Sequence, residues 1–167
     1  NYSGADNLGL NISGKKLSII SLGDVVFDAN SSDLNFLIVL GGSDVSICDI
    51  VITGFNTKQA NALIYNGGDL TVDGCVFTNN TLATLAEGWT ESIIYNVRNL
   101  NVVDSEFYNN TIDKGSIIYS KSQSNLIVNE STFENNIFNG DEVHIIEIEN
   151  ANSAKIISSV FAENRLW

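Results

Sequence analysis

The stretch "STFENNI" at residues 131–137 decides the fold of this chain, because close relatives of it recur along the sequence. The others are "CVFTNNT" at residues 75–81, "SEFYNNT" at residues 105–111 and "SVFAENR" at residues 159–165. Each has a small residue, then Phe two positions later, then Asn three positions after the Phe. Recurrence at intervals of 26 to 30 residues indicates a repeat architecture.

Apolar residues alternate with polar ones before each copy, as in "LTVDGCVF" from residue 70 and "LNVVDSEF" from residue 100. Two turn-forming residues interrupt the alternation, which is typical of two short strands joined by a bend. A third apolar run, such as "SIIYN" at residues 92–96, completes each unit. The pattern predicts three short strands per unit and no helix, with units that start at Leu17, Val45, Leu70, Leu100, Leu126 and Ala154.

A unit of three short strands cannot bury its apolar face unless it stacks on copies of itself. In-register stacking pairs each strand in parallel with its copy about 4.8 Å away. We therefore expect an all-β fold, a single-stranded parallel β-helix (β-solenoid) that occupies residues 1–167 as one domain of about six coils. An internal column of Phe77, Phe107, Phe133 and Phe161 should run along its axis. A second column, of Asn80, Asn110, Asn136 and Asn164, should lie at the bend after the second strand, where stacked Asn side chains can bond to one another.

The composition narrows the functional classes. Net charge is −12, with 20 acidic residues against 8 basic ones, which argues against nucleic acid because phosphate binding needs clustered Lys and Arg. No apolar run approaches the roughly 20 residues of a membrane-spanning helix, so we expect no membrane insertion within this chain. Met is absent, which suggests a processed piece of a longer protein, and Asn-x-Ser/Thr sequons give weak support for export.

The repeats resemble those of adhesin-like surface proteins of methanogenic archaea, in which F-x-x-N closes a coil and a strand similar to "SIIY" follows. The first thirty residues, "NYSGADNLGLNISGKKLSIISLGDVVFDAN", resemble the first coils of that group. More distantly, the repeats are similar to those of chlamydial polymorphic outer-membrane proteins, although the "GGAI" motif of the latter is not present. The resemblance implies a right-handed β-helix displayed at the cell surface, extracellular and often part of a longer protein.

An enzyme is the less favoured alternative, although β-helices also host polysaccharide-cleaving enzymes. Such chemistry needs carboxylates gathered on one face with a cation or a basic side chain. His144 is the only histidine and is expected at the start of a strand; the acidic residues near it are Asp141, Glu142, Glu147 and Glu149. This pattern is more typical of a solvated face, so we expect no catalytic residues, no metal site and no cofactor.

Recognition would require exposed side chains on loops or on the outer face. The longest connection, "TLATLAEGWTE" at residues 81–91, contains Leu82, Leu85 and Trp89, which look exposed and are the candidates for binding. The favoured alternative is that the loop packs these apolar residues against the solenoid. Tyr65, Tyr95 and Tyr119 should form a third ladder, and the sequence leaves open whether it faces in or out. The expected partner is a glycan or protein on the surface of another cell.

A structural role is the second alternative, because the two ends of a solenoid carry unpaired strands that favour end-to-end association. The apolar residues expected at these ends are Leu10 and Ile12 on one side and Leu166 and Trp167 on the other. Such a chain would be a subunit of a surface sheath or filament. The two cysteines, Cys48 and Cys75, fall in different positions of the repeat, which favours free thiols, although a disulfide between neighbouring coils stays possible.

Overall fold

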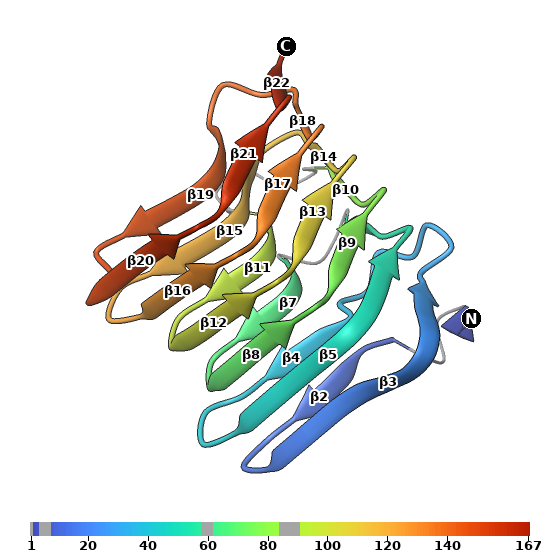
Figure 1. Ribbon diagram of the computed structural model, residues 1–167, viewed down its shortest axis with the longest axis vertical. Coiled ribbons are helices and arrows are strands. Elements are labelled where there is room, and N and C mark those ends of the chain that lie inside the picture. Colours follow the sequence, from blue (N-terminus) through green and yellow to red (C-terminus); the bar gives the residue numbers. More distant parts are fainter. Residues whose placement is uncertain (1, 4–7, 58–61, 84–90) are drawn as a thin grey trace.

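The computed structural model describes residues 2–3, 8–57, 62–83 and 91–167 of the chain. Regular structure in these ranges is entirely β-strand, arranged as a β-solenoid of about six coils, which confirms the predicted fold class (Figure 1). The first and last coils lie at opposite ends of the stack. No helix among the described residues is long and apolar enough to span a membrane.

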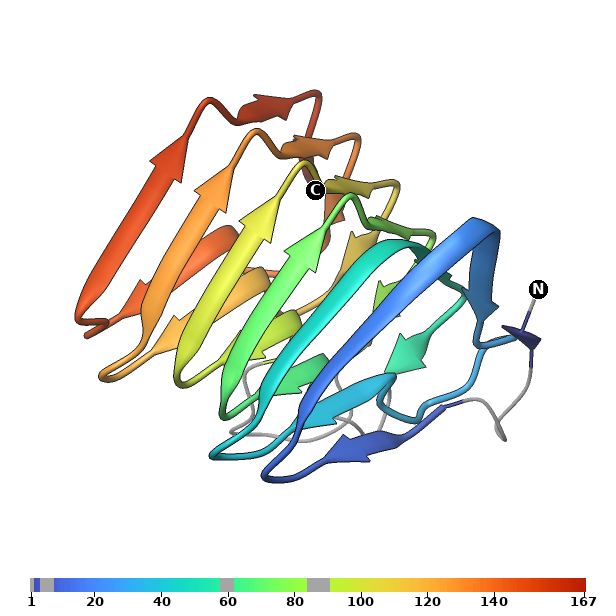
Figure 2. The same cartoon turned by 60° about the horizontal axis from the view of Figure 1, so that its bottom comes forward.

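Three parallel sheets form the walls of the solenoid (Figures 1 and 2). The first sheet bends within each coil and contains β1 (Tyr2–Ser3), β3 (Lys16–Asp28), β5 (Asp44–Thr53), β8 (Asp69–Asp73), β9 (Val76–Thr78), β12 (Asn99–Val103), β13 (Glu106–Tyr108), β16 (Asn125–Asn129), β17 (Thr132–Glu134), β20 (Ser153–Ile157) and β21 (Val160–Ala162). In each of the last four coils the bend coincides with a residue of positive φ between the two consecutive strands of this sheet, namely Gly74, Asp104, Glu130 and Ser158.

The second sheet contains β2 (Leu10–Ile12), β4 (Leu37–Val39), β7 (Ala62–Asn66), β11 (Ser92–Asn96), β15 (Gly115–Lys121) and β19 (Val143–Glu149). The third contains two-residue strands, β6 (Asn56–Thr57), β10 (Thr81–Leu82), β14 (Thr111–Ile112), β18 (Ile137–Phe138) and β22 (Arg165–Leu166). Each of the last four coils therefore runs through one strand of the second sheet, two of the first and one of the third. The sequence pattern predicted three strands per coil and missed the two-residue strand.

In-register pairing keeps equivalent residues of successive coils above one another. Leu70, Leu100 and Leu126 are register partners along the first sheet, and the valines two positions later align in the same way. All of these side chains are buried, and they belong to one continuous hydrophobic core along the axis. The period of two in each unit thus becomes a set of internal columns, in which every apolar residue packs on its counterpart in the next coil.

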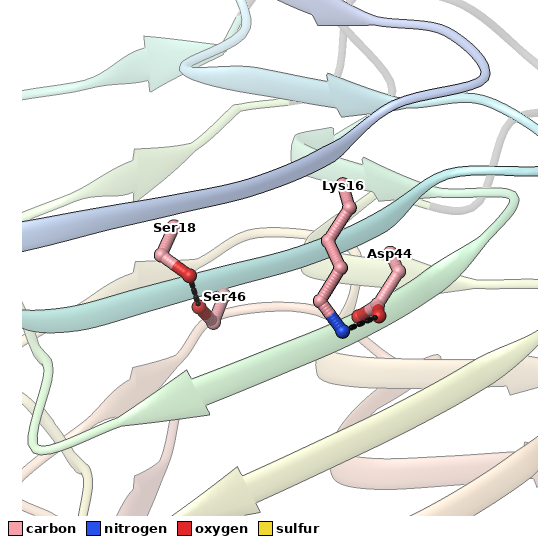
Figure 3. A network of polar contacts seen from close by, with 4 residues as sticks. All are labelled: Lys16, Ser18, Asp44 and Ser46. Atoms are coloured by element: carbon pink, nitrogen blue, oxygen red, sulfur yellow. Dashed lines mark hydrogen bonds and ion pairs between the residues drawn. The ribbon is translucent and has the colours of Figure 1, made fainter.

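Polar side chains join the first two coils on the outer face of the first sheet. On the first two coils, Lys16 Nζ lies 2.8 Å from Asp44 Oδ2, and Ser46 Oγ donates to Ser18 Oγ over 2.7 Å (Figure 3). Each contact joins register partners on β3 and β5. Exposed pairs of this kind contribute little to stability, so they make the face soluble rather than hold the coils together.

Candidate functional site

The buried amide ladder, Asn80, Asn110, Asn136 and Asn164, is the main polar feature inside the solenoid. Asn80 Nδ2 donates to Asn110 Oδ1 over 3.1 Å, and the same link joins each later pair over 3.0 and 2.9 Å. The backbone N–H of each of the first three asparagines donates to the same oxygen of the next coil. Each Nδ2 also donates to a carbonyl of the preceding coil, those of Ile52, Phe77, Phe107 and Phe133.

The phenylalanine stack runs beside this ladder, as the repeat predicts. The rings of Phe77 and Phe107 are nearly parallel with centroids 4.7 Å apart, and the spacing continues at 4.8 and 4.9 Å through Phe133 to Phe161. This distance equals the separation of neighbouring strands, so each ring is positioned by the pairing of its own strand. Both ladders therefore serve the stacking of coils and present no chemical group to solvent within the stack.

A second buried polar ladder, which the sequence analysis missed, lies on the second sheet. Asn66 Nδ2 donates to Asn96 Oδ1 over 2.8 Å, and Asn96 Nδ2 donates to Ser120 Oγ over 3.0 Å. Asn66 and Asn96 also bind the backbone N–H two residues later, at Gly68 and Arg98. The signal was present in the aligned endings "IYN", "IYN" and "IYS" of the third run of each unit.

The tyrosine stripe, Tyr65, Tyr95 and Tyr119, faces outward. Tyr119 lies between the buried Ile118 and Ser120 and shares its face of β15 with the partly exposed Lys121. The rings of Tyr65 and Tyr95 stack with centroids 5.8 Å apart, and those of Tyr95 and Tyr119 lie 5.1 Å apart at a tilt of 60°. The stripe is therefore a row of neighbouring aromatic rings on the outside of the second sheet, of which the first two are stacked.

Only part of this stripe is available for contact. Tyr65 and Tyr95 are half-buried, whereas Tyr119 is 3% exposed and its hydroxyl donates to the carboxylate of Glu149 in the next coil. Burial is the main cause that raises the pKa of Tyr119 above its ordinary value, and the hydrogen bond to Glu149 is the next. The phenol therefore stays protonated and acts as the donor. A ligand on this face would meet Tyr65 and Tyr95 first.

The expected binding loop is only partly described. The prediction that Leu82 is exposed was wrong, because Leu82 is 0% exposed and pairs with Ile112 and Thr57 on the third sheet. Its side chain lies in the hydrophobic core, where β10 directs it inward. Leu85 and Trp89 lie outside the described residues. Of the three residues, Leu82 thus serves coil stacking and offers nothing to a ligand.

The region around His144 is a shallow, charged surface pocket of about 290 Å³. Lys114, Gly115, Glu142, His144 and Glu147 line it, and His144 Nδ1 lies 3.4 Å from Glu147 Oε2. His144 is more than half exposed at the start of β19, as its position in the repeat predicts. Within the described ranges, no three His, Cys, Asp or Glu side chains are grouped to hold a metal ion.

The two ends of the solenoid differ in exposure. At the first coil Leu10 and Ile12 are half-buried, and the ring of Tyr2 stacks on Phe27 with centroids 5.1 Å apart. At the last coil Leu166 and Trp167 are 73% and 78% exposed. The C-terminal end is thus the more open of the two apolar surfaces that the sequence predicted.

Both cysteines are free thiols, and they differ in accessibility. Cys48 is partly exposed, whereas Cys75 is fully buried in the small-residue column and its Sγ lies 3.4 Å from the Ile47 carbonyl. Burial raises the pKa of the Cys75 thiol from 9.0 to about 11, and partial burial with the nearby Asp73 raises the pKa of Cys48. The thiolate is the reactive species, so Cys75 should be protected.

We expect Cys75 in the folded protein to react with a thiol reagent at pH 8 at least about 100-fold more slowly than Cys48, since both access and thiolate fraction are reduced. The rates are measured with Ellman's reagent on Cys48→Ser and Cys75→Ser, each of which leaves one thiol. Denaturant should bring the two rates together. Equal rates in the folded protein would contradict the inward placement of Cys75.

Comparison with models of protein families, with curated proteins and with solved structures finds no match for this chain.

Proposed function

We propose that this chain is a non-enzymatic, extracellular adhesin-like module, a rigid rod that presents the outside of its second sheet to a glycan or protein on another cell. The observation that carries the proposal is the stacked, half-buried pair Tyr65 and Tyr95 on that face. Aromatic rings with an exposed polar hydroxyl suit contact with sugars and with protein surfaces.

The packing of the solenoid interior supports this assignment, because the inward side chains are used to join the coils and are not available to bind a ligand. The inward positions are occupied by the hydrophobic core, the phenylalanine stack and the two buried polar ladders, all of which contact neighbouring coils. Recognition is therefore left to the outer faces and the connections. Next to the tyrosine stripe, Lys121 and Glu149 add charged groups of both signs, whose Nζ and Oε2 lie 4.0 Å apart. A mixed aromatic and charged face is typical of contact surfaces.

The proposal is tested by binding of the purified chain to arrays of glycans and of cell-surface proteins. We expect binding that falls at least tenfold in the double variant Tyr65→Ala, Tyr95→Ala. Tyr108→Ala, which removes a half-buried aromatic residue from β13 on the first sheet, is the matched control and should bind as the natural chain does. Absence of binding across the arrays, or equal binding by both variants, would reject attachment through this face.

The second candidate function is a structural subunit that assembles end to end, and a specific observation favours it. It is the in-register pairing of successive coils, which would join the last coil of one chain to the first coil of another in the same way. Sedimentation velocity over a range of concentrations tests it, and a chain that stays monomeric at every concentration would reject it.

A further inference from the structure

A glycine directly follows Asn or Asp at three places in the chain, namely Asn66-Gly67, Asp73-Gly74 and Asn139-Gly140. In such a pair the glycine nitrogen can attack the side-chain carbonyl carbon, because glycine has no Cβ to hinder the approach. Asn is counted among the thermolabile residues of proteins. The reaction needs a side chain that can move and a glycine N–H that is not already bonded, so the fold decides which pair reacts.

The first two pairs are held by the pairing of coils. Asn66 is 0% exposed, and its side-chain amide is bonded within the second buried polar ladder. The N–H of Gly67 donates to the Val39 carbonyl over 2.7 Å, and that of Gly74 donates to the Val103 carbonyl over 3.1 Å. Attack by either glycine would break a hydrogen bond between coils, so both nitrogens are blocked while the solenoid is folded.

The third pair, Asn139-Gly140, lies in the turn between β18 and β19 and differs in both respects (Figure 1). Asn139 is exposed, and its Nδ2 donates to Asp113 Oδ1 over 2.8 Å in a contact that is itself exposed. Among the hydrogen bonds of the described residues, none is donated by the Gly140 N–H. The side chain can therefore leave its partner for water, and the nitrogen is free to react.

These features belong to the turn and do not depend on its place in the stack. Phe138 is in register with Ile112, so Asp113 and Lys114 hold the positions of Asn139 and Gly140 in the preceding coil. Both are partly exposed although a further coil follows them. The N–H of Lys114, like that of Gly140, donates none of the hydrogen bonds in the described ranges. The turn is thus open to water within the stack.

Packing between coils explains why glycine stands at position 140. A Cβ at Gly140 would overlap the carbonyl oxygen of Asp113 in the preceding coil, so only glycine fits there. The residue before it, Asn139, supplies the amide that bonds to the Asp113 side chain. The contacts that join these two turns therefore also create an Asn-Gly pair on the surface.

We propose that Asn139 is a site of spontaneous modification to aspartate and isoaspartate. The Gly140 nitrogen bonds to Asn139 Cγ and gives its proton to water, the side-chain nitrogen leaves as ammonia, and a succinimide ring forms. Water then adds to either ring carbonyl and breaks its bond to the glycine nitrogen. The product has a new carboxylate beside Asp113, so repulsion between like charges replaces a hydrogen bond between coils.

The test is incubation of the folded chain at pH 8 in water labelled with heavy oxygen, followed by peptide mapping with mass spectrometry. We expect Asn139 to react at least about tenfold faster than Asn66, whose reaction requires local opening of the coils, and to take its new oxygen from the solvent. Urea should bring the two rates together. Equal rates in the folded chain, or no reaction at Asn139 in the time that the unfolded chain reacts, would overturn the proposal.

A variant gives a second readout. Asn139→Gln keeps the amide but disfavours ring closure, so the acidic species that accumulates on ion exchange should no longer form, with folding checked by circular dichroism. Asn152→Gln, at an exposed asparagine that precedes Ser153, is the matched control and should form that species at the natural rate. Formation at the natural rate in Asn139→Gln, or its loss only in Asn152→Gln, would place the reaction elsewhere and overturn the proposal.

Discussion

Asn110→Leu should lower the free energy of unfolding by about 3–5 kcal/mol, because it removes the central amide of a buried ladder. Asn110 Oδ1 accepts from both the backbone N–H and Nδ2 of Asn80, and Asn110 Nδ2 donates to the Phe77 carbonyl. Leu has the same branched arrangement of four side-chain heavy atoms but makes none of these contacts. The substitution leaves the Asn80 N–H and the Phe77 carbonyl buried without these partners, and each such group costs about 1–3 kcal/mol.

The matched control is Asn99→Leu in the same coil. Asn99 also belongs to a ladder, since its Nδ2 donates to Asp69 Oδ1 over 2.6 Å and its Oδ1 accepts from Asn125 Nδ2 over 2.7 Å. That ladder is exposed, so water replaces the lost partners and we expect a change under about 1 kcal/mol. Both variants are compared by urea unfolding followed by circular dichroism. Equal losses would show that the buried ladder contributes no more than a surface one.

The internal columns were predictable from the sequence because stacking demands identity at each position. Phe77, Phe107 and Phe133 recur with the same neighbours, and only in-register pairing gives such recurrence a physical use. The polar ladders follow the same rule. Asn66 and Asn96 also recur but were not predicted, because the apolar run of their strand ends one residue before each of them.

The third sheet could not be inferred from periodicity, because a strand of two residues has no period. Alignment of the units would have revealed it. The residue two positions after the ladder asparagine is Leu82, Ile112, Phe138 or Leu166, always apolar. The exposure assigned to Leu82 was wrong for this reason, since the position belongs to the stack and not to the insertion that follows it.

The orientation of the tyrosine stripe also lay beyond the sequence. In "LIY" and "IIY" apolar residues occupy both faces of the strand, so alternation does not separate inside from outside. The neighbours of Tyr119 on its own strand and in the next coil resolve it. Glu147 and Lys121, which share a face with Tyr119 across the β15–β19 pair, carry charges that the core would not accept. The charged residues on the same face therefore show that the tyrosine side chains point outward.

Gly115→Ala should lower the free energy of unfolding by about 3 kcal/mol or more, for reasons of backbone conformation and space together. Gly115 begins β15 with φ +90°, a region that residues with a Cβ avoid. An added Cβ would overlap the carbonyl of Glu91 in the preceding coil. That carbonyl accepts from the Ser116 N–H over 2.9 Å, so it cannot move without loss of the strand pairing.

Gly14→Ala separates the two causes. Gly14 also has positive φ, at +60°, but a Cβ there would have no atom within 4 Å. This control should therefore cost only the conformational penalty of roughly 1 kcal/mol. Urea unfolding measures both variants. A loss of stability for Gly115→Ala no larger than that for Gly14→Ala would mean that the coils separate easily at this point. In that case β15, which carries Tyr119, would not hold the tyrosine stripe in a fixed register between β11 and β19.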